Sequence, residues 1–497
     1  MFPFGIPTIR ADASTAVQRA FLVEIANTIS QFRNYLEQLG DIQRNAEAIL
    51  AAVTYPVLTL PNEITSRIFV ACLPSHGRVR SSPHAAPLLL AQICRHWREV
   101  ALSTCELWSS VDLGTFREDQ ASCLLETWFI RAKCSPLSLT LRDRWVWDTR
   151  DFRPKKEDLR LIPIFSSSLQ RLELHIPNEL LGQLQPFPRF PNLRRLRLFD
   201  SHRSDEMSPM DILDILAKAP CLVELHLSRI PVEAVSFVAS LTSLEITRAT
   251  DVTTFLHTLT VLPLLAHFGC RLQGTIEEAA TQPITSLLLR SLALESEYDL
   301  PEDNIIPTLT FLTLPNLNRL KIEGKSTLEG VLSFVSRSSC TLDNFHLNLG
   351  NYSSEDRVSC LVAFPTLSTL HVTLPHDDKE GNDHFLDILT STTPTLMPQL
   401  QTLSIFAVEQ RIDYFLLIQM LRSRRALEGP PVLHTFRLEL EEDLEGSNAS
   451  SWLPGPLEGE AFECLIMDGL KFKIEWANRT LWPEATIVDA CETFSYW

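Results

Sequence analysis

The stretch Pro315-Asn-Leu-Asn-Arg-Leu-Lys-Ile-Glu323 decides the fold of this chain. Its apolar side chains stand at Leu317, Leu320 and Ile322, in the spacing L-x-x-L-x-L. Because side chains alternate between the two faces of an extended strand, Leu320 and Ile322 point to one face and Lys321 points to the other. The stretch therefore predicts a short strand whose apolar face has to be covered by neighbouring segments.

The same pattern recurs through most of the chain. Its further copies are Leu169/Leu172/Leu174, Leu193/Leu196/Leu198, Leu222/Leu225/Leu227, Leu241/Leu244/Ile246, Leu265/Phe268/Cys270, Ile284/Leu287/Leu289, Leu342/Phe345/Leu347, Leu367/Leu370/Val372, Leu400/Leu403/Ile405 and Leu433/Phe436/Leu438. The mean spacing, about 26 residues, is typical of leucine-rich repeats, which this part of the chain resembles. The asparagine or cysteine that this family places after its strand is mostly missing, so we expect an irregular solenoid.

Helical segments alternate with these predicted strands, for example at Met210–Ala217, Leu328–Val335 and Phe385–Leu389. An earlier helix over 119–133, followed by a strand over 136–141, is interpreted as the first repeat. A single repeat cannot bury its own apolar face, so the repeats must stack. The predicted fold class is an α/β repeat, in which an N-terminal helix and a small three-helix unit are joined to an irregular leucine-rich-repeat solenoid.

The pattern divides the chain into four predicted parts. They are an N-terminal amphipathic helix over 12–54, a three-helix unit over 55–111, the solenoid over 112–445 and a C-terminal capping segment over 446–497. The capping segment is expected because the open end of a solenoid must be covered.

Residues 55–111 follow a different pattern from the repeats. Leu60-Pro-Asn-Glu63 reads as a helix start, because proline is tolerated in the first turn and glutamate suits the positive end of the helix dipole. Apolar side chains follow on one face, and a polar loop comes after Pro74. A second helix is predicted over 87–103, and a short third element carries Leu107 and Trp108.

This unit resembles the F-box in the form common in fungi, where it follows an N-terminal heptad helix. The residues that carry the resemblance are Leu60, Pro61, Glu63, Ile64, Ile68, Phe69, Leu73, Ile93, Cys94, Trp97, Ala101, Leu107 and Trp108. The loop from Ser75 to Ala86 is longer than the usual linker of the family. Lengthening a loop costs little entropy, so the three-helix unit should still form.

The resemblance implies that the unit docks to the Skp-type adaptor of a cullin-based (SCF) ubiquitin ligase. Matching the motif residue by residue assigns adaptor contacts to Leu60, Pro61, Ile64, Ile68 and Leu107. Leu73, Ile93 and Trp97 are assigned to the core of the unit. From the apolar pattern alone, all of these residues would be interpreted as the core of a three-helix unit.

The N-terminal segment from about Thr15 to Val53 carries a narrow apolar stripe of the coiled-coil kind. Its members are Leu22, Ile25, Ile29, Phe32, Leu36, Leu39, Ile42, Ala46, Ile49 and Val53. The step from Leu39 to Ile42 is irregular, and Gly40 weakens the helix beside it. Two interpretations stay open: the helix packs on its own chain, or it self-associates through the stripe.

Composition excludes several classes of protein. Lys and Arg number 44 against 61 Asp and Glu, a net charge of −17, which argues against binding of nucleic acid or of an anionic membrane surface. No apolar run is long enough to span a membrane. The eleven cysteines show no CxxC pair, and the N-terminus has no basic stretch leading into an apolar run. We therefore expect an intracellular protein of the cytoplasm or nucleus, with reduced thiols.

The variable residue between the two leucines of each strand should face the concave side of the solenoid. Candidate contacts with a protein substrate at this position are Arg197, His226, Lys321, His346, His371 and Arg437. His346 and His371 fall in adjacent repeats and are interpreted as two neighbouring exposed histidines. A metal site needs three or four ligands, and no third ligand joins them, so neither a metal nor another cofactor is expected.

No motif for catalysis is present, since the chain lacks GxGxxG, GxxxxGK[ST], HExxH and GxSxG. The sequence therefore predicts a non-catalytic substrate receptor of a ubiquitin ligase, whose expected partners are the Skp-type adaptor, the cullin scaffold and a protein substrate. The alternative is a protein-interaction scaffold outside the ubiquitin pathway.

Overall fold

The computed structural model describes residues 14–52, 56–74, 77–113, 121–142, 159–177, 180–181, 184, 187–200, 214–228, 238–274, 283–296, 305–324, 326–375, 378–390, 396–408, 412–425, 433–441, 454–476 and 479–482. The chain divides into two compact units, Met1–Ile68 and Phe69–Trp497. The boundary between the units falls inside helix α2 (Asn62–Ala71).

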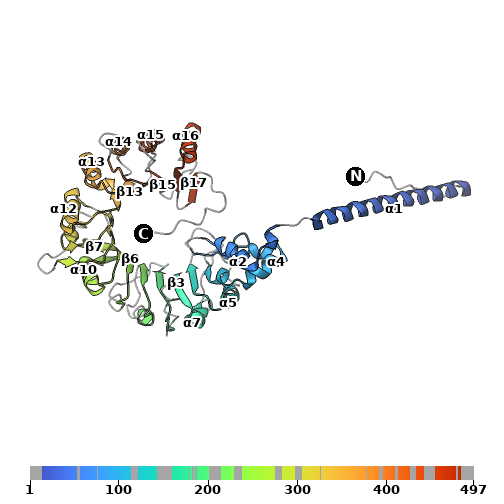
Figure 1. The fold of residues 1–497 in the computed structure, drawn as a ribbon, viewed down its shortest axis with the longest axis horizontal. Helices are drawn as coiled ribbons and strands as arrows, with labels where there is room; N and C mark the ends of the chain where they lie inside the picture. Colours follow the sequence, from blue (N-terminus) through green and yellow to red (C-terminus); the bar gives the residue numbers. More distant parts are fainter. Residues whose placement is uncertain are drawn as a thin grey trace. The chain divides into compact units, whose positions relative to one another are not determined.

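The first unit contains α1 (Thr15–Ala52), a continuous helix of 38 residues (Figure 1). This confirms the predicted N-terminal helix. Gly40 lies inside α1 without interrupting it, at a cost of about 1 kcal/mol relative to alanine. A short 3-10 helix, η1 (Pro56–Thr59), precedes α2. No helix among the described residues has both the length and the apolar character needed to cross a membrane.

The second predicted helix, over 87–103, is in fact two helices, α3 (Leu90–Ile93) and α4 (Arg95–Ser103). The break is at Cys94, which is extended at φ −154° and ψ 170°. Its Sγ accepts a hydrogen bond from the backbone N–H of Trp97 at 3.4 Å and so caps α4. The third predicted element is the 3-10 helix η2 (Cys105–Trp108).

Parallel strands form the body of the second unit. In the described part of the chain they make one 15-stranded sheet, whose spatial order follows the sequence. Each neighbouring pair is parallel except the last. The strands are β1 (Ser110–Asp112), β2 (Leu137–Arg142), β3 (Leu169–Ile176), β4 (Arg195–Asp200), β5 (Glu224–Ser228), β6 (Ser243–Asp251), β7 (His267–Gln273), β9 (Ser291–Ser296), β11 (Arg319–Glu323), β12 (Asn344–Asn348), β13 (Thr369–Leu374), β14 (Thr402–Val408), β15 (Thr435–Glu441), β16 (Lys471–Trp476) and β17 (Arg479–Trp482).

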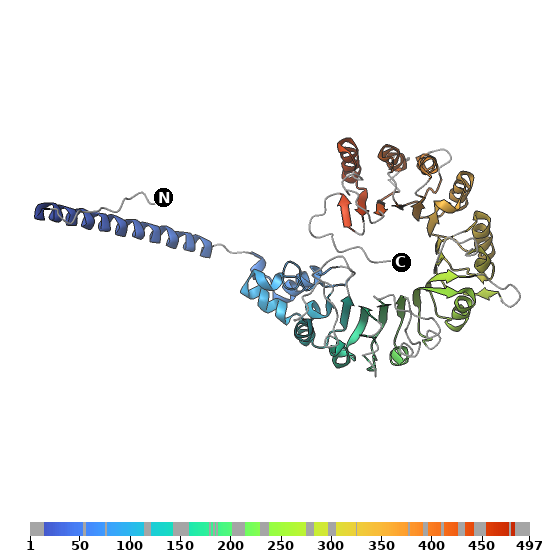
Figure 2. The ribbon, with the colours of Figure 1, turned by 180° about the vertical axis from the view of Figure 1, so that it is seen from behind.

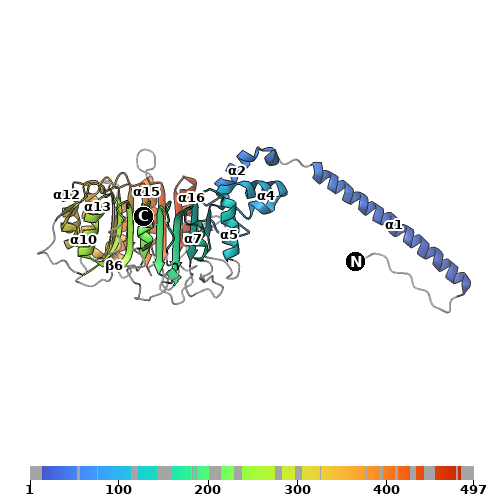
Figure 3. The same ribbon diagram turned by 90° about the horizontal axis from the view of Figure 1, so that it is seen from below.

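The second unit is an arc, with the sheet on its inner side and the helices on its outer side (Figures 1 and 2). Figure 3 shows the strands standing side by side. The helices are α5 (Ala121–Ala132), α7 (Leu161–Phe165), α10 (Val252–Val261), α11 (Ile306–Thr310), α12 (Leu328–Ser338), α13 (Ser354–Ala363), α14 (Lys379–Thr390), α15 (Tyr414–Arg425) and α16 (Pro456–Met467), with the 3-10 helix η5 (Leu349–Asn351). The predicted α/β solenoid is confirmed at this level.

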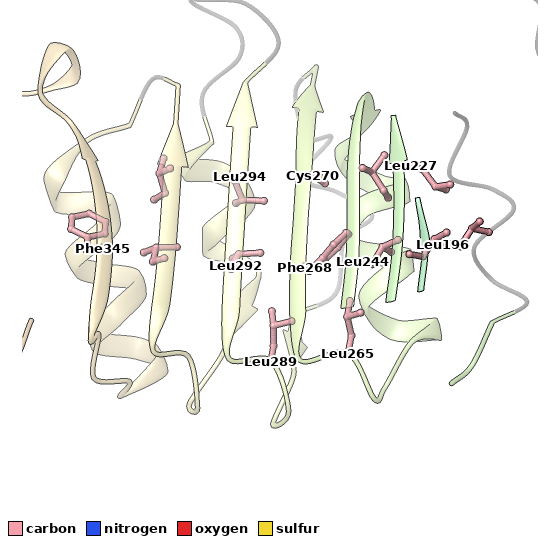
Figure 4. Packing of buried hydrophobic residues seen from close by; sticks show 14 of the residues in the cluster. Leu196, Leu227, Leu244, Leu265, Phe268, Cys270, Leu289, Leu292, Leu294 and Phe345 are labelled. Atoms are coloured by element: carbon pink, nitrogen blue, oxygen red, sulfur yellow. The ribbon is translucent and has the colours of Figure 1, made fainter. Parts of the chain in front are cut away.

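The apolar side chains of the repeated pattern form continuous rows across the sheet (Figure 4). In one row Leu196, Leu225, Leu244 and Phe268 are register partners on successive strands, and Leu292 continues it. All five are buried. Full burial of such a side chain contributes about 1.5–3 kcal/mol, so stacking the repeats supplies the core that no single repeat possesses.

One predicted copy of the pattern, Ile284/Leu287/Leu289, is wrong. Ile284 belongs to β8 (Ile284–Thr285), which pairs with β10 (Leu312–Thr313) in a separate two-stranded sheet, and Leu287 is exposed. The strand of this repeat is β9, so its copy is Leu289/Leu292/Leu294. Ile284/Leu287/Leu289 and Leu289/Leu292/Leu294 both have the required apolar spacing. The pairing of β9 with β7 and β11 shows that Leu289/Leu292/Leu294 is the copy.

Residues 77–82 cover the N-terminal edge of the sheet. The backbone carbonyl of Val79 accepts from the N–H of Asp112 at 2.8 Å, and Arg80 forms a parallel bridge with the same residue. The hydroxyl of Ser110 donates to the carbonyl of Gly77 at 2.5 Å. Residues 77–80 of the long predicted loop therefore form an additional edge of the sheet.

The parallel sheet continues past residue 445, into the predicted capping segment. There α16 and β16 form a further repeat, with Phe436 and Phe472 as register partners. Strand β17 then pairs antiparallel with β16. The aromatic rings of Phe462 and Phe472 stack at 4.4 Å, which packs α16 against this end of the sheet.

Candidate functional site

The predicted substrate contacts lie in a single row along the inner face of the sheet, which we call the central row. Its members are register partners from β3 to β16: Glu173, Arg197, His226, Glu245, Gly269, Ala293, Lys321, His346, His371, Ser404, Arg437 and Lys473. All six residues predicted for the concave face are therefore on one surface. Gly269 and Ala293 separate its charged part into two halves.

His346 and His371 are adjacent in the central row, as the sequence predicted. Their rings stack at 6.1 Å between centroids. His346 Nε2 lies 2.9 Å from Thr373 Oγ1, and its side chain is only 12% exposed. The interpretation of two exposed histidines was therefore wrong, because the neighbouring side chains of the inner face cover them.

Burial keeps both histidines uncharged near neutral pH. It lowers the pKa of His346 to about 3, helped by the positive charge of Lys321 and by His371. It lowers the pKa of His371 to about 4, helped by Arg437 and Lys321. His226 is far from this pair, at about 24 Å for five strand spacings, and its Nδ1 lies 2.8 Å from Glu245.

Lys321 stands between two carboxylates. Its Nζ lies 2.9 Å from Glu295 Oε1 and 3.1 Å from Glu323 Oε1. Burial opposes a charged ammonium group, yet the charges of Glu323 and Glu295 raise the pKa of Lys321. Glu323 also lies 3.5 Å from His346 Nε2. Among the described residues, no group of three histidine, cysteine or acidic side chains is arranged to hold a metal ion.

Arg437, at the far end of the row, is also engaged within the chain. Its Nε lies 2.9 Å from Glu439 Oε1 and contacts the buried carboxylate of Glu475. The sequence predicted Arg437 as a substrate contact. It could not show the contact with Glu475, because Glu475 belongs to the next strand.

The other half of the inner face carries three neighbouring arginines, one of which is ion-paired. Arg171 and Arg195 are register partners on β3 and β4, and Arg197 lies two residues along β4. Arg195 pairs with Glu224 at 2.8 Å. Within the described residues, neither Arg171 nor Arg197 forms an ion pair. Burial and the charges of Arg195 and Arg197 lower the pKa of Arg171, which shows that like charges are crowded here.

Glu173 is the acidic counterpart beside these arginines. It lies 2.9 Å from Arg78 and 3.7 Å from Arg142, and His175 Nε2 is 2.8 Å away. Burial alone would raise its pKa, but the hydrogen bond to His175 and the charge of Arg78 lower it to about 2. Arg78 comes from the long loop, and sequence reasoning missed its role because the partners are 95 residues apart.

The predicted adaptor contacts divide into exposed and buried residues. Ile64 and Ile68 are 43% and 42% exposed and stand one helical turn apart on α2. Pro61 is exposed, and Leu60 is half-buried. Leu107 is fully buried in η2, so it belongs to the core and its assignment as an adaptor contact is corrected.

The three residues assigned to the core of the unit also divide. Trp97 and Leu73 are partly buried against the core, and the Trp97 ring meets Phe69 edge-on at 4.9 Å. Ile93, at the end of α3, is instead exposed. The break at Cys94 changes the direction of the chain after Ile93, which is why the pattern of one long helix misplaced this residue.

Comparison with known proteins gives no family for this chain: no family model and no curated protein matches it. Among solved structures, a protein from Bacteroides fragilis is similar at a TM-score of 0.31 and 15% identity, covering 62% of this chain and 74% of that one. TLR13 in its complex with ssRNA13 is similar at a TM-score of 0.32 and 15% identity, covering 62% of this chain and 43% of that one. TM-scores this low support no conclusion about function.

Proposed function

We propose that this protein is the substrate-recognition subunit of an SCF-type ubiquitin ligase. Two exposed isoleucines, Ile64 and Ile68, carry the proposal, because they lie on α2 within the segment that resembles an F-box. In this role the F-box-like segment binds the Skp-type adaptor and the solenoid binds a client protein. The chain itself performs no chemistry.

The apolar surface of the F-box-like segment suits a permanent protein partner. Between residues 57 and 68, four apolar side chains are at least 40% exposed: Val57, Leu58, Ile64 and Ile68. Apolar residues gathered on one short segment are typical of a protein-binding site. A few such side chains, once buried by a partner, dominate the binding energy of an interface.

The inner face of the solenoid suits a protein client. Lys321, His346 and Arg437 already have partners within the chain, whereas Arg171 and Arg197 have no ion-pair partner among the described residues. Two such guanidinium groups favour a client segment that carries carboxylates. The client therefore contributes an acidic segment that lies over β3 and β4.

Proximity is the proposed mechanism. A client held on the solenoid, in a complex that also holds the charged carrier enzyme, presents its lysines at high effective concentration. Ubiquitin transfer is then performed by other subunits of the ligase.

The test is capture of a purified Skp-type adaptor by the full chain and by the variant Ile64→Asp/Ile68→Asp. The matched control is Ile130→Asp/Ile164→Asp, which changes two isoleucines of α5 and α7 that are 61% and 66% exposed. Capture by the parent and the control, with loss in the α2 variant, supports the proposal. A folded parent that captures no adaptor overturns it and favours an interaction scaffold outside the ubiquitin pathway.

A further inference from the structure

Helix α1 has a strict heptad register, which differs from the apolar stripe described above at Ile42. With Leu22 as position a, the a and d positions are Leu22, Ile25, Ile29, Phe32, Leu36, Leu39, Gln43 and Ala46, and Leu50 continues the series in the sequence. The irregular step at Ile42 disappears, because Ile42 takes position g. The register spans about four heptads, which is the length expected of a coiled coil.

Four of the apolar a and d side chains of α1 are well exposed. Leu22, Ile29, Leu36 and Leu39 are all exposed on this helix. A seam of this kind is covered in coiled coils by a second helix, whose side chains insert between those of the first.

The flanking positions fit a second copy of the same helix in parallel orientation. In a parallel pair each g residue faces the e residue of the partner helix five positions further along. This pairs Phe21 with Ala26, Thr28 with Arg33, Tyr35 with Gly40 and Ile42 with Glu47, so each aromatic g residue faces a small e residue. No like charges meet. In an antiparallel pair, g residues would face g residues and e residues would face e residues. Gly40 would then not face Tyr35.

Gln43 is the one polar residue at these a and d positions. Its Nε2 donates to Glu47 Oε1 at 2.9 Å, which orients the amide on the seam side of the helix. A carboxamide both donates and accepts, so two Gln43 side chains at the same level can bond to each other. A single polar residue at position a fixes register and favours one oligomeric state.

We propose that α1 forms a parallel, in-register coiled coil with a second copy of this chain. The complementary residues at positions e and g, together with the self-complementary Gln43, point to a second copy as the occupant of the seam. Each assembly then presents two solenoids. This inference stands independently of the adaptor, since it concerns α1 alone.

The test is the mass of the full chain in solution, measured by light scattering for the parent, Leu36→Lys and Val23→Lys. Leu36 is at position a and Val23 is at the outward position b, and the two are similarly exposed at 66% and 61%. The expected masses are twice 56.3 kDa for the parent and for Val23→Lys, and 56.3 kDa for Leu36→Lys. A monomeric parent, or a dimeric Leu36→Lys variant, overturns the proposal.

The orientation is tested by oxidative cross-linking of Gln43→Cys, with the parent and Arg44→Cys as controls. In the parallel, in-register pair two residues at position 43 face each other, whereas residues at position 44 lie on the outer face. We expect a covalent dimer from Gln43→Cys above the level of both controls. In an antiparallel pair an a residue faces a d residue, so cross-linking at the control level overturns the parallel register.

Discussion

At the scale of single residues, the inner face of the solenoid carries charged side chains that are ion-paired within the chain and arginines that have no ion-pair partner among the described residues. Lys321 is only 8% exposed, and a buried ammonium without partners would cost several kcal/mol. Glu295 and Glu323 offset this cost. Arg171 and Arg197, on the first half of the face, have no ion-pair partner among the described residues, and the proposed function assigns them to contact with a client.

The stability of the fold should depend on pH through His346 and His371. An unfolded histidine has a pKa of about 6.5, and in the folded protein the values are about 3 and about 4, so acid protonates the unfolded chain first. The stabilisation is complete above pH 6.5 and is lost as the pH falls toward 4. Between pH 7.5 and 5.5 the free energy of unfolding should drop by about 1.4 kcal/mol for each histidine.

Urea unfolding at these two pH values measures the drop, and His346→Gln/His371→Gln separates the histidines from other groups. The double variant should show a pH dependence smaller than that of the parent by about 2–3 kcal/mol. An unchanged pH dependence would mean that the two histidines bind protons equally in the folded and unfolded states, and would contradict the lowered pKa values.

The sequence predicted which side chains face inward but not which of them are engaged. Alternation along each strand placed Arg197, Lys321 and Arg437 in one row, as observed. Their partners depend on the register between strands and on loops. Glu475 lies on a strand that the sequence assigned to the capping segment, and Arg78 lies in a loop. A single repeat contains no information about either contact.

At the scale of elements, arginines near the ends of helices join one repeat to the repeat before it. Arg424 of α15 donates from Nε to the carbonyl of Leu389, in the last turn of α14, at 2.8 Å. Arg337 of α12 donates to the carbonyl of Leu312 at 3.2 Å, after α11 has ended. The carbonyl of Leu389 lies in the last turn of its helix, where carbonyls lack a partner within the helix, and that of Leu312 lies in β10; the guanidinium group of the next repeat donates to each.

Replacing Arg424 with methionine should therefore destabilise the solenoid. The change leaves buried carbonyl oxygens without donors, which costs about 1–3 kcal/mol. The matched control is Arg422→Met, in the same turn of α15, because Arg422 is exposed. Thermal or urea unfolding of both variants measures the difference. Equal stability of the two variants would show that the contact contributes nothing.

The sequence predicted the repeating elements better than their boundaries. The strands of most repeats and the helices α5, α12 and α14 follow from apolar spacing, because that spacing reflects burial in the stacked core. The break at Cys94 was missed, since an apolar pattern continues through it and the capping thiol is not a common helix-capping group. Of the predicted helix at Met210–Ala217, residues 210–213 lie outside the described residues, and residues 214–217 are helical.

At the scale of the whole solenoid, both ends of the sheet are extended by segments outside the predicted repeats. Residues 77–82 add an edge beside β1, and α16 with β16 adds a repeat beside β15. Exposed sheet edges invite pairing with other chains, and these segments occupy the outer edges of β1 and β15. The polar loop after Pro74 thus has a structural role in the solenoid, through Val79 and Arg78.

The measurement that tests the central claim most directly is a calorimetric titration of a Skp-type adaptor into the full chain. The account predicts one adaptor per chain with a Kd of about 1 µM or tighter. Leu60→Ala/Pro61→Ala should weaken binding at least about tenfold, a change of about 1.4 kcal/mol, while leaving the unfolding transition intact. A folded parent that releases no heat with adaptor at about 50 µM would contradict the account.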